Sequence, residues 1–163
     1  MTPKAESALE VNGKGVFTSL VIDALHGGAA DLRGHITPGS IYAYVDQALG
    51  AWDQRPIFKT NVTRFTSLRS ISPPIPLDTL RKLCIYFPAP QDEHPLDPSY
   101  EFTESTADPV KVAILKDLQK FVAVGLVVPV DEEHMYFAAI NSKSCRLTAL
   151  GFQYWRLVKE KKL

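Results

Sequence analysis

The chain of 163 residues is long enough for one domain of average size or two small ones. Lys and Arg total 18, as do Asp and Glu, so the formal net charge is zero and the chain lacks the basic excess that is typical of nucleic-acid-binding proteins. Hydrophobic residues make up 45% of the chain and charged residues 22%, which is typical of a globular protein and excludes extensive disorder.

Three features of the sequence bear on the cellular compartment. The longest apolar run, from Phe121 to Val130, is too short to span a membrane as a helix. The first residues lack the basic and then apolar layout of a signal peptide. Cys84 and Cys145 alone cannot form a framework of disulfides. We therefore expect a cytoplasmic protein with reduced cysteines and no membrane partner.

Prolines divide the chain into parts. Most of the 12 prolines lie between residues 73 and 109, where each ring removes a backbone donor and fixes φ. The segment 87–98 is therefore predicted to form neither a helix nor a central strand. We predict a first module at 1–69, a proline-rich connector at 70–104 with one short helix over 77–85, and a second module at 105–163.

The first module is predicted to contain two helices and a strand. Apolar residues recur with helical spacing over 17–25, and Gly27 and Gly28 are expected to end that helix. A second helix is predicted to begin at Thr37, whose hydroxyl would cap it, and to continue with an apolar stripe over 41–52.

A short strand is predicted over 56–60. Helices that alternate with strands favour an α/β arrangement, but two helices cannot cover both faces of a sheet. We therefore expect the first module to be incomplete by itself.

The second module is predicted to begin and end with a helix. Asp108 is expected to cap the first of these helices and Gly125 to end it. The side of this helix that faces the core is predicted to carry Val110, Ile114, Leu118, Phe121 and Val122.

Between these helices we predict a hairpin. Its strands would be 126–130 and 135–141, joined by the polar turn 131–134. The last helix is predicted to begin at Thr148, with Leu150 among the residues that face inward.

Residues that commonly bind metals or act as nucleophiles lack partners at suitable spacing. The four histidines are His26, His35, His94 and His134. None has a second ligand at metal-site spacing and there is no Cys-x-x-Cys, so we expect no metal or other cofactor. Cys84 lies among apolar residues, and no general base is near Cys145 in sequence, so both are interpreted as structural. The chain is therefore predicted to carry no catalytic residue.

A family resemblance begins in the first module. Its runs, in order, are Ala8-Leu-Glu10, Gly15-Val-Phe-Thr18, Gly28-Ala-Ala-Asp31, Gly34-His-Ile-Thr37, Tyr42-Ala-Tyr-Val45 and Gln54-Arg-Pro-Ile-Phe58. Their order and spacing resemble the C-terminal, small-subunit-like part of the caspase-like cysteine proteases (the caspase/metacaspase clan). The resemblance covers about residues 5–60.

The resemblance implies a partial α/β domain, in which helices flank a mostly parallel sheet whose central strands lie outside these residues. The family's catalytic histidine and cysteine come from Ser-Gly-His-Gly and Asp-x-Cys-x-x-Gly motifs, and neither motif occurs here. The resemblance therefore implies that this chain is a noncatalytic portion of a caspase-like endopeptidase. To hydrolyse a protein or peptide substrate, this portion would need a large-subunit-like chain or an upstream segment that carries the Cys and His. Glu6 and Ser7 would border the substrate pocket and are the substrate-binding candidates. The turn over 31–35 has a single carboxylate, so the calcium site of some relatives is not expected.

The second module resembles another fold, that of a small α+β winged-helix domain. Residues 118–158 are similar to its latter half, with the phrases Val124-Gly-Leu-Val127 and Arg146-Leu-Thr-Ala-Leu-Gly151. Such domains bind DNA or proteins. The acidic run Asp131-Glu-Glu133 in the turn would repel phosphates, so the charge pattern argues against nucleic acid as a partner. The alternative function is a noncatalytic adaptor or regulator that uses this module for protein interaction or, against the charge pattern, for DNA binding.

Overall fold

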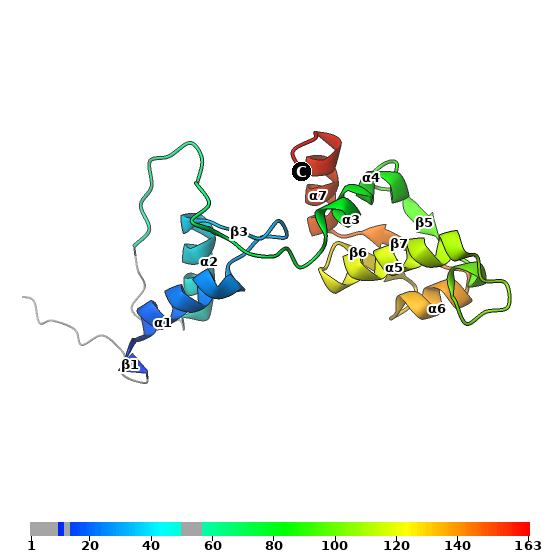
Figure 1. Cartoon of the computed structure of the whole chain (residues 1–163), viewed down its shortest axis with the longest axis horizontal. Helices are drawn as coiled ribbons and strands as arrows, with labels where there is room; N and C mark the ends of the chain where they lie inside the picture. Colours follow the sequence, from blue (N-terminus) through cyan, green and yellow to red (C-terminus); the bar gives the residue numbers. More distant parts are fainter. Residues whose placement is uncertain (1–9, 12–13, 50–56) are drawn as a thin grey trace, which may run out of the picture. The chain divides into compact units, whose positions relative to one another are not determined.

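The computed structural model describes residues 10–11, 14–49 and 57–163. The chain divides into two compact units, residues 1–74 (unit 1) and 75–163 (unit 2), and each is described by itself. Both units combine helices with short strands (Figure 1), so the mixed α/β class is confirmed. No described helix is long and apolar enough to cross a membrane.

Unit 1 contains two short pairs of antiparallel strands. Strand β1 (Glu10–Val11) pairs with β2 (Lys14–Gly15), and β3 (His35–Ile36) pairs with β4 (Arg69–Ser70). Every described strand pair of the chain is antiparallel, so the mostly parallel sheet that the caspase-like resemblance implies is not present in the described part.

The first helix of unit 1 ends where the sequence predicts. Helix α1 (Val16–Asp23) continues into a π-helical turn, η1 (Ala24–Gly28). Gly27 has a φ of 133°, a backbone conformation that residues with a Cβ rarely adopt, and this conformation ends the helix.

The second helix, α2 (Pro38–Ala48), begins with the predicted cap. The Thr37 hydroxyl accepts a hydrogen bond from the Ser40 amide (3.1 Å), and the Ser40 hydroxyl accepts one from the Thr37 amide (3.0 Å). This reciprocal pair is a capping box, which satisfies two donors that the helix leaves free. Trp52, the last residue of the predicted apolar stripe, lies outside the described residues.

The strand predicted over 56–60 is not formed in the described residues 57–60, which have no regular structure. Phe58 instead stacks on Tyr42 of α2, with the ring centroids 4.9 Å apart, and lies 5.9 Å from the ring of Phe65. Aromatic packing on a helix thus replaces the predicted strand pairing.

Unit 1 has a small core. Ala24, Ile36 and Val45 are fully buried, and Ile71 is one of the partly buried residues that pack against Ala24 and Ile36. Gly34 allows this packing, because a Cβ at that position would lie 2.2 Å from the carbonyl oxygen of Ile71.

Unit 2 is built from nine short elements. They are α3 (Leu77–Arg81), α4 (Leu83–Tyr86), β5 (Glu93–Pro95), the 3-10 helix η2 (Pro98–Tyr100), α5 (Pro109–Ala123), β6 (Val127–Val130), α6 (Met135–Ile140), β7 (Ser144–Leu147) and α7 (Ala149–Lys159).

Residues 75–104, which the sequence analysis sets apart within the connector, belong to unit 2 in the structure. The helix predicted over 77–85 forms as the consecutive helices α3 and α4. Leu80, Leu83 and Phe87 are fully buried, so this segment contributes a large share of the core.

The sheet of unit 2 has the strand order β5–β7–β6 and is antiparallel throughout. The two edge strands each contain a proline, Pro95 in β5 and Pro129 in β6. A proline cannot donate a backbone hydrogen bond, so both edges are poor templates for a further strand.

The predicted hairpin is wrong in its second strand. Residues 135–140 form helix α6, and the partner of β6 is β7. Met135, Ala138 and Ala139 are buried, and this i, i+3, i+4 spacing is that of one helix face. The turn of the predicted hairpin is therefore a longer connection that contains a helix.

Helix α5 confirms the predicted start and corrects the predicted buried face. The Asp108 carboxylate accepts a hydrogen bond from the Val110 amide (2.7 Å), and Gly125 has a φ of 73° beyond the helix end. Val110 itself is 69% exposed, whereas Leu118 and Phe121 are fully buried.

Helix α7 begins as predicted, with the Thr148 hydroxyl accepting a hydrogen bond from the Gly151 amide (3.0 Å). Tyr154 is buried, but Leu150 is 40% exposed, so the prediction that Leu150 faces inward is wrong.

Candidate functional site

The substrate-binding candidates Glu6 and Ser7 lie outside the described residues. Within the part of the chain that the structure describes, no three His, Cys, Asp or Glu side chains gather as a metal site would require. The remaining candidates for chemistry are the two cysteines and their neighbours.

Cys145 and His94 are directly opposite each other on β7 and β5, a pairing that the sequence analysis missed. Such neighbours could form a nucleophile–base pair. However, Nδ1 of His94 lies 3.0 Å from the carbonyl oxygen of Tyr86, and Nε2 lies 3.1 Å from the hydroxyl of Tyr100. Both ring nitrogens therefore have partners other than the thiol, and His94 orders an aromatic cluster instead of activating Cys145.

The environments of both thiols oppose ionisation. Burial, with a further contribution from the charge of Glu93, raises the pKa of Cys145 to about 12. Burial also raises the pKa of Cys84, although the nearby Lys159 charge opposes this shift. Because the thiolate is the nucleophile, both cysteines are poor candidates for catalysis.

We expect native-state alkylation to show this directly. At pH 7 a thiol with a pKa of about 12 is ionised in roughly one molecule in 10⁵, so Cys145 should react with iodoacetamide far more slowly than free cysteine. Cys84 should also react slowly, and both should react at the ordinary rate in urea. The variant Cys84→Ser has Cys145 as its remaining thiol, so mass spectrometry of this variant shows which modified peptide belongs to which cysteine. Rapid, selective modification of either thiol in the folded protein would contradict a structural role.

A second polar cluster centres on Asp117 of α5, whose side chain is only 8% exposed. Its carboxylate accepts hydrogen bonds from Lys82 Nζ (2.6 Å), the Tyr86 hydroxyl (2.9 Å) and Lys120 Nζ (3.0 Å). The cluster ties α5 to the turn between α3 and α4. With three donors on one carboxylate, Asp117 is suited to holding helices together rather than to accepting a proton.

The pKa of Asp117 reflects two opposing effects. Burial raises it, but hydrogen bonds from Lys82, Lys120 and Tyr86 lower it more, so the pKa lies below its ordinary value. The same interaction with Asp117 raises the pKa of Lys82. Asp117 is therefore charged at neutral pH and attractive to the lysines beside it.

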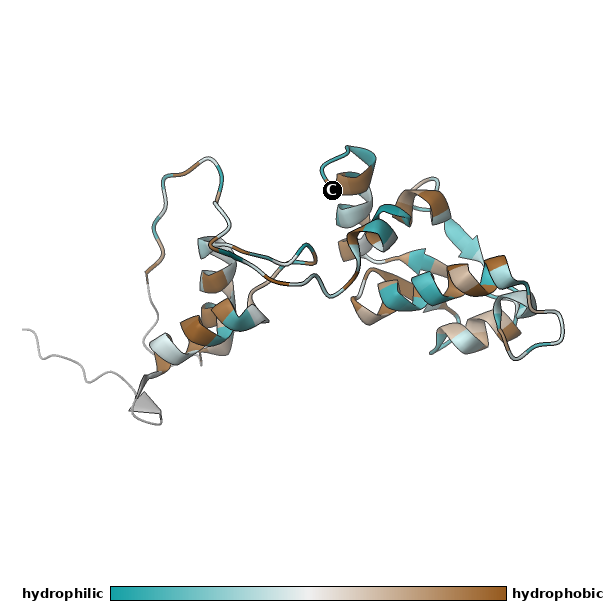
Figure 2. Cartoon of the chain, in the orientation of Figure 1, coloured by the Kyte–Doolittle hydropathy of each residue, from teal (hydrophilic) through white to brown (hydrophobic). Residues whose placement is uncertain are grey.

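Unit 1 presents apolar residues that its own small core does not cover. Figure 2 shows hydrophobic residues along α1, yet none of residues 16–23 is fully buried, and Phe17 is 52% exposed. In the segment that follows α2, Ile57 is 84% and Leu68 is 59% exposed. Exposed apolar surface on this scale often marks an interaction site.

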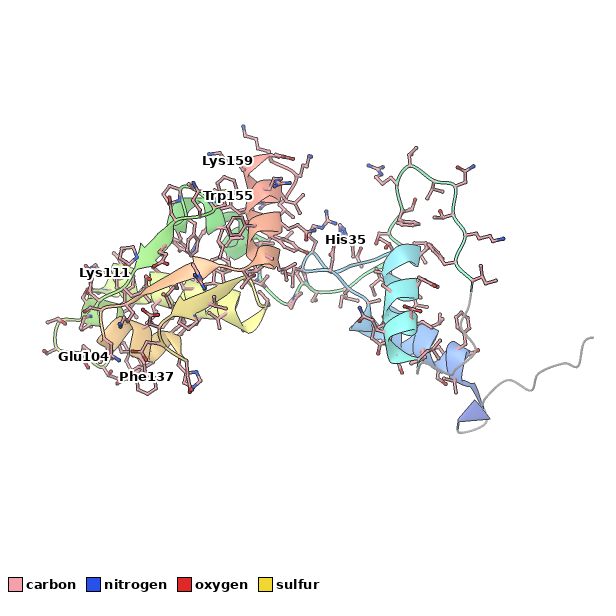
Figure 3. The ribbon with its side chains drawn as sticks, turned by 180° about the vertical axis from the view of Figure 1, so that it is seen from behind. His35, Glu104, Lys111, Phe137, Trp155 and Lys159 are labelled. Carbon is pink, nitrogen blue, oxygen red and sulfur yellow. The ribbon has the colours of Figure 1, made fainter. Side chains whose placement is uncertain are left out.

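The residues that Figure 3 labels in unit 2 lie toward two ends, with Lys111 on the same side as Glu104. Figure 3 shows Glu104 and Phe137 at one end, and Trp155 and Lys159 at the other. On α5, the helix that would read DNA in a winged-helix domain, Lys120 is already paired with Asp117. Lys111 of the same helix is paired with Asp97, so two of the three lysines of α5 have an acidic partner within unit 2.

The Asp117 cluster and the pairing of His94 with Cys145 are features that the sequence did not predict. The only local signal for the cluster is the i, i+3 spacing of Asp117 and Lys120, whereas Lys82 and Tyr86 come from a distant segment. Comparisons of the chain with known protein families, with curated proteins and with solved structures found no match.

Proposed function

We propose that this chain is the noncatalytic, small-subunit-like portion of a caspase-like cysteine endopeptidase. It would require a chain or upstream segment that bears the catalytic Cys and His in order to hydrolyse peptide bonds. The observation that carries this proposal is the apolar helix α1, in which none of residues 16–23 is fully buried.

A partner sheet would supply what unit 1 lacks. Burying one Leu, Ile or Phe side chain contributes roughly 1.5–3 kcal/mol. In α1, Phe17 is 52% exposed and Leu20 and Val21 are only partly buried, so much of this stabilisation is not realised within unit 1. In the family that the first module resembles, helices in this position pack on the sheet that ends in the catalytic residues.

The chemistry of the described thiols supports a noncatalytic role. Cys145 has a pKa of about 12, and the pKa of Cys84 is also raised. The histidine opposite Cys145 is engaged by Tyr86 and Tyr100. Hydrolysis would therefore depend on a cysteine and a histidine supplied from elsewhere.

A noncatalytic adaptor is the second candidate, and unit 2 favours it. This unit encloses a core of its own, with Leu83, Phe87, Leu118 and Phe121 fully buried. In either function we propose that unit 2 contacts proteins rather than DNA, because residues 131–133 are all acidic and Lys120 is paired within the unit.

The test is reconstitution with a large-subunit-like chain that carries both catalytic motifs. The isolated chain should show no peptidase activity, and mixing should produce activity that is lost on alkylating the partner's cysteine. Phe17→Asp should weaken binding of the partner at least about tenfold, because it places a charge on the apolar helix. Ile85→Asp, at a position of unit 2 that is 72% exposed, is the matched control and should bind normally.

Two results would count against the proposal. Peptide hydrolysis by the isolated chain would show that it has an active site of its own. Stable, monomeric folding with no binding to any such partner would favour the adaptor instead.

A further inference from the structure

The exposed face of α6 combines aromatic rings with carboxylates. Tyr136 and Phe137 are 42% and 46% exposed, and their rings meet edge to face with centroids 5.3 Å apart. Residues 131–133 are acidic and are followed by His134, whose ring centroid lies 6.2 Å from that of Phe137. The Asp131 side chain is 74% exposed. We call residues 131–137 the acidic aromatic end of unit 2.

Little of this negative charge is neutralised nearby. Lys143 approaches Asp131 at 4.0 Å, the limit of an ion pair, and Glu132 is held by the neutral Asn141 amide at 2.7 Å. Aromatic faces beside carboxylates are a good environment for lysine and arginine side chains, which can lie over the rings while pairing with the acids. The chemistry of this end therefore selects a basic segment with some apolar character.

This chain contains such a segment at the opposite end of unit 2. The basic residues Arg156, Lys159, Lys161 and Lys162 are exposed. Glu160, which pairs with Lys162 at 2.5 Å, is the acidic residue among them. Lys159 already lies over the ring of Trp155, 5.7 Å from its centroid. We call residues 155–162 the basic end.

The two ends cannot meet within one unit. Figure 3 shows Phe137 and Glu104 at one end of unit 2, and Trp155 and Lys159 at the other. Two such surfaces can meet only between copies, either along a chain of copies or in an antiparallel pair that makes the contact twice.

We propose that unit 2 associates head to tail with a second copy of this chain, the acidic aromatic end of one copy binding the basic end of the next. Each exposed ion pair contributes little, so the association is weak, dependent on concentration and sensitive to salt. It is independent of the surface on unit 1, which is apolar and whose association would strengthen rather than weaken as sulfate is added.

Sedimentation equilibrium of the full chain tests this proposal. At 50 mM NaCl the average mass should rise above the 18.1 kDa of one chain as concentration increases, and 500 mM NaCl should weaken the association by about tenfold or more. The variant Glu132→Gln/Glu133→Gln removes charge from the acidic aromatic end while keeping an acceptor for Asn141. The variant Lys159→Gln/Lys162→Gln removes charge from the basic end.

Mixing these variants gives the sharpest result. Each alone should lose the salt-sensitive association, because each lacks one end. An equimolar mixture should recover it as a complex of two chains and no more, since each variant still has the end that the other lacks. Lys116→Gln, at an exposed position in the middle of α5, is the control and should associate like the wild type.

The opposite outcomes overturn the proposal. A wild type that stays monomeric at low salt would exclude self-association, and so would a mixture that fails to recover what each variant lost. Association that salt and both variants leave unchanged would place the contact on unit 1 instead. Monomeric protein that shifts with random duplex DNA in a salt-dependent manner would assign the basic end to nucleic acid.

Discussion

Replacing Gly151 with alanine is expected to lower the free energy of unfolding of unit 2 by roughly 1–3 kcal/mol, because the added methyl group has no room. A Cβ at this position would lie 2.1 Å from the carbonyl oxygen of Leu126 and 3.2 Å from Cβ of Leu147. Alanine favours a helix by about 1 kcal/mol over glycine, which is too little to offset such an overlap.

The Leu126 carbonyl cannot easily move away from that methyl group. It accepts a hydrogen bond from the Thr148 amide (2.9 Å). The Thr148 hydroxyl donates a hydrogen bond to the carbonyl oxygen of Gly125 (2.7 Å). The start of α7 is therefore held against the end of α5 and the start of β6 by several bonds that an outward shift would break.

Urea denaturation followed by circular dichroism measures the effect of Gly151→Ala. Gln153→Ala, at an exposed position of the same helix, is the control and should change stability by less than about 0.5 kcal/mol. Equal midpoints for the two variants would mean that α7 does not approach Leu126 as closely as the structure shows.

Replacing Asp117 with asparagine is expected to lower stability by about 2 kcal/mol, since hydrogen bonds to a charged group contribute roughly 1.5–3 kcal/mol when they are lost. The carboxylate is 8% exposed and accepts from Lys82, Tyr86 and Lys120. Asparagine has one acceptor oxygen and no charge, so two lysines would face a neutral amide. Asp78→Asn, in an ion pair whose carboxylate is 93% exposed, is the matched control and should change stability little.

The contribution of Asp117 should also depend on pH in a defined direction. The pKa of Asp117 is lower in the folded chain than the ordinary value of about 4 for an unfolded aspartate. Its stabilisation is therefore fully present above that ordinary pKa and is lost as pH falls through the lowered, folded pKa. The wild type and Asp117→Asn should differ in stability at pH 7 and converge in strong acid. A difference that stays constant down to acidic pH would show that charge is not the cause.

Local signals predicted the ends of helices well. Thr37, Asp108 and Thr148 cap helices at the expected positions, and Gly27 and Gly125 take the positive φ values that a helix end favours. A cap depends on residues within one turn of each other, so its signal is contained in a few consecutive positions.

Apolar runs without clear periodicity were predicted poorly. Residues 135–140 consist of Met, Tyr, Phe, two Ala and Ile, a run that a strand or a helix could contain. Tertiary packing decided for the helix, because it buries Met135, Ala138 and Ala139 together. The segment 57–60 was predicted to be part of a strand but has no regular structure, and Phe58 stacks on Tyr42 instead.

The sequence by itself determined that this is a neutral chain in which no catalytic motif is recognisable, with capped helices, a thiol among apolar residues at Cys84 and no general base near Cys145. Only the tertiary structure decided that residues 75–104 belong to the core of unit 2 and that Asp117 receives donors from a distant segment. It likewise placed Phe137 and Lys159 at opposite ends of that unit. The reason is physical: capping and composition are local, whereas burial and charge pairing depend on which distant segments meet when the chain folds.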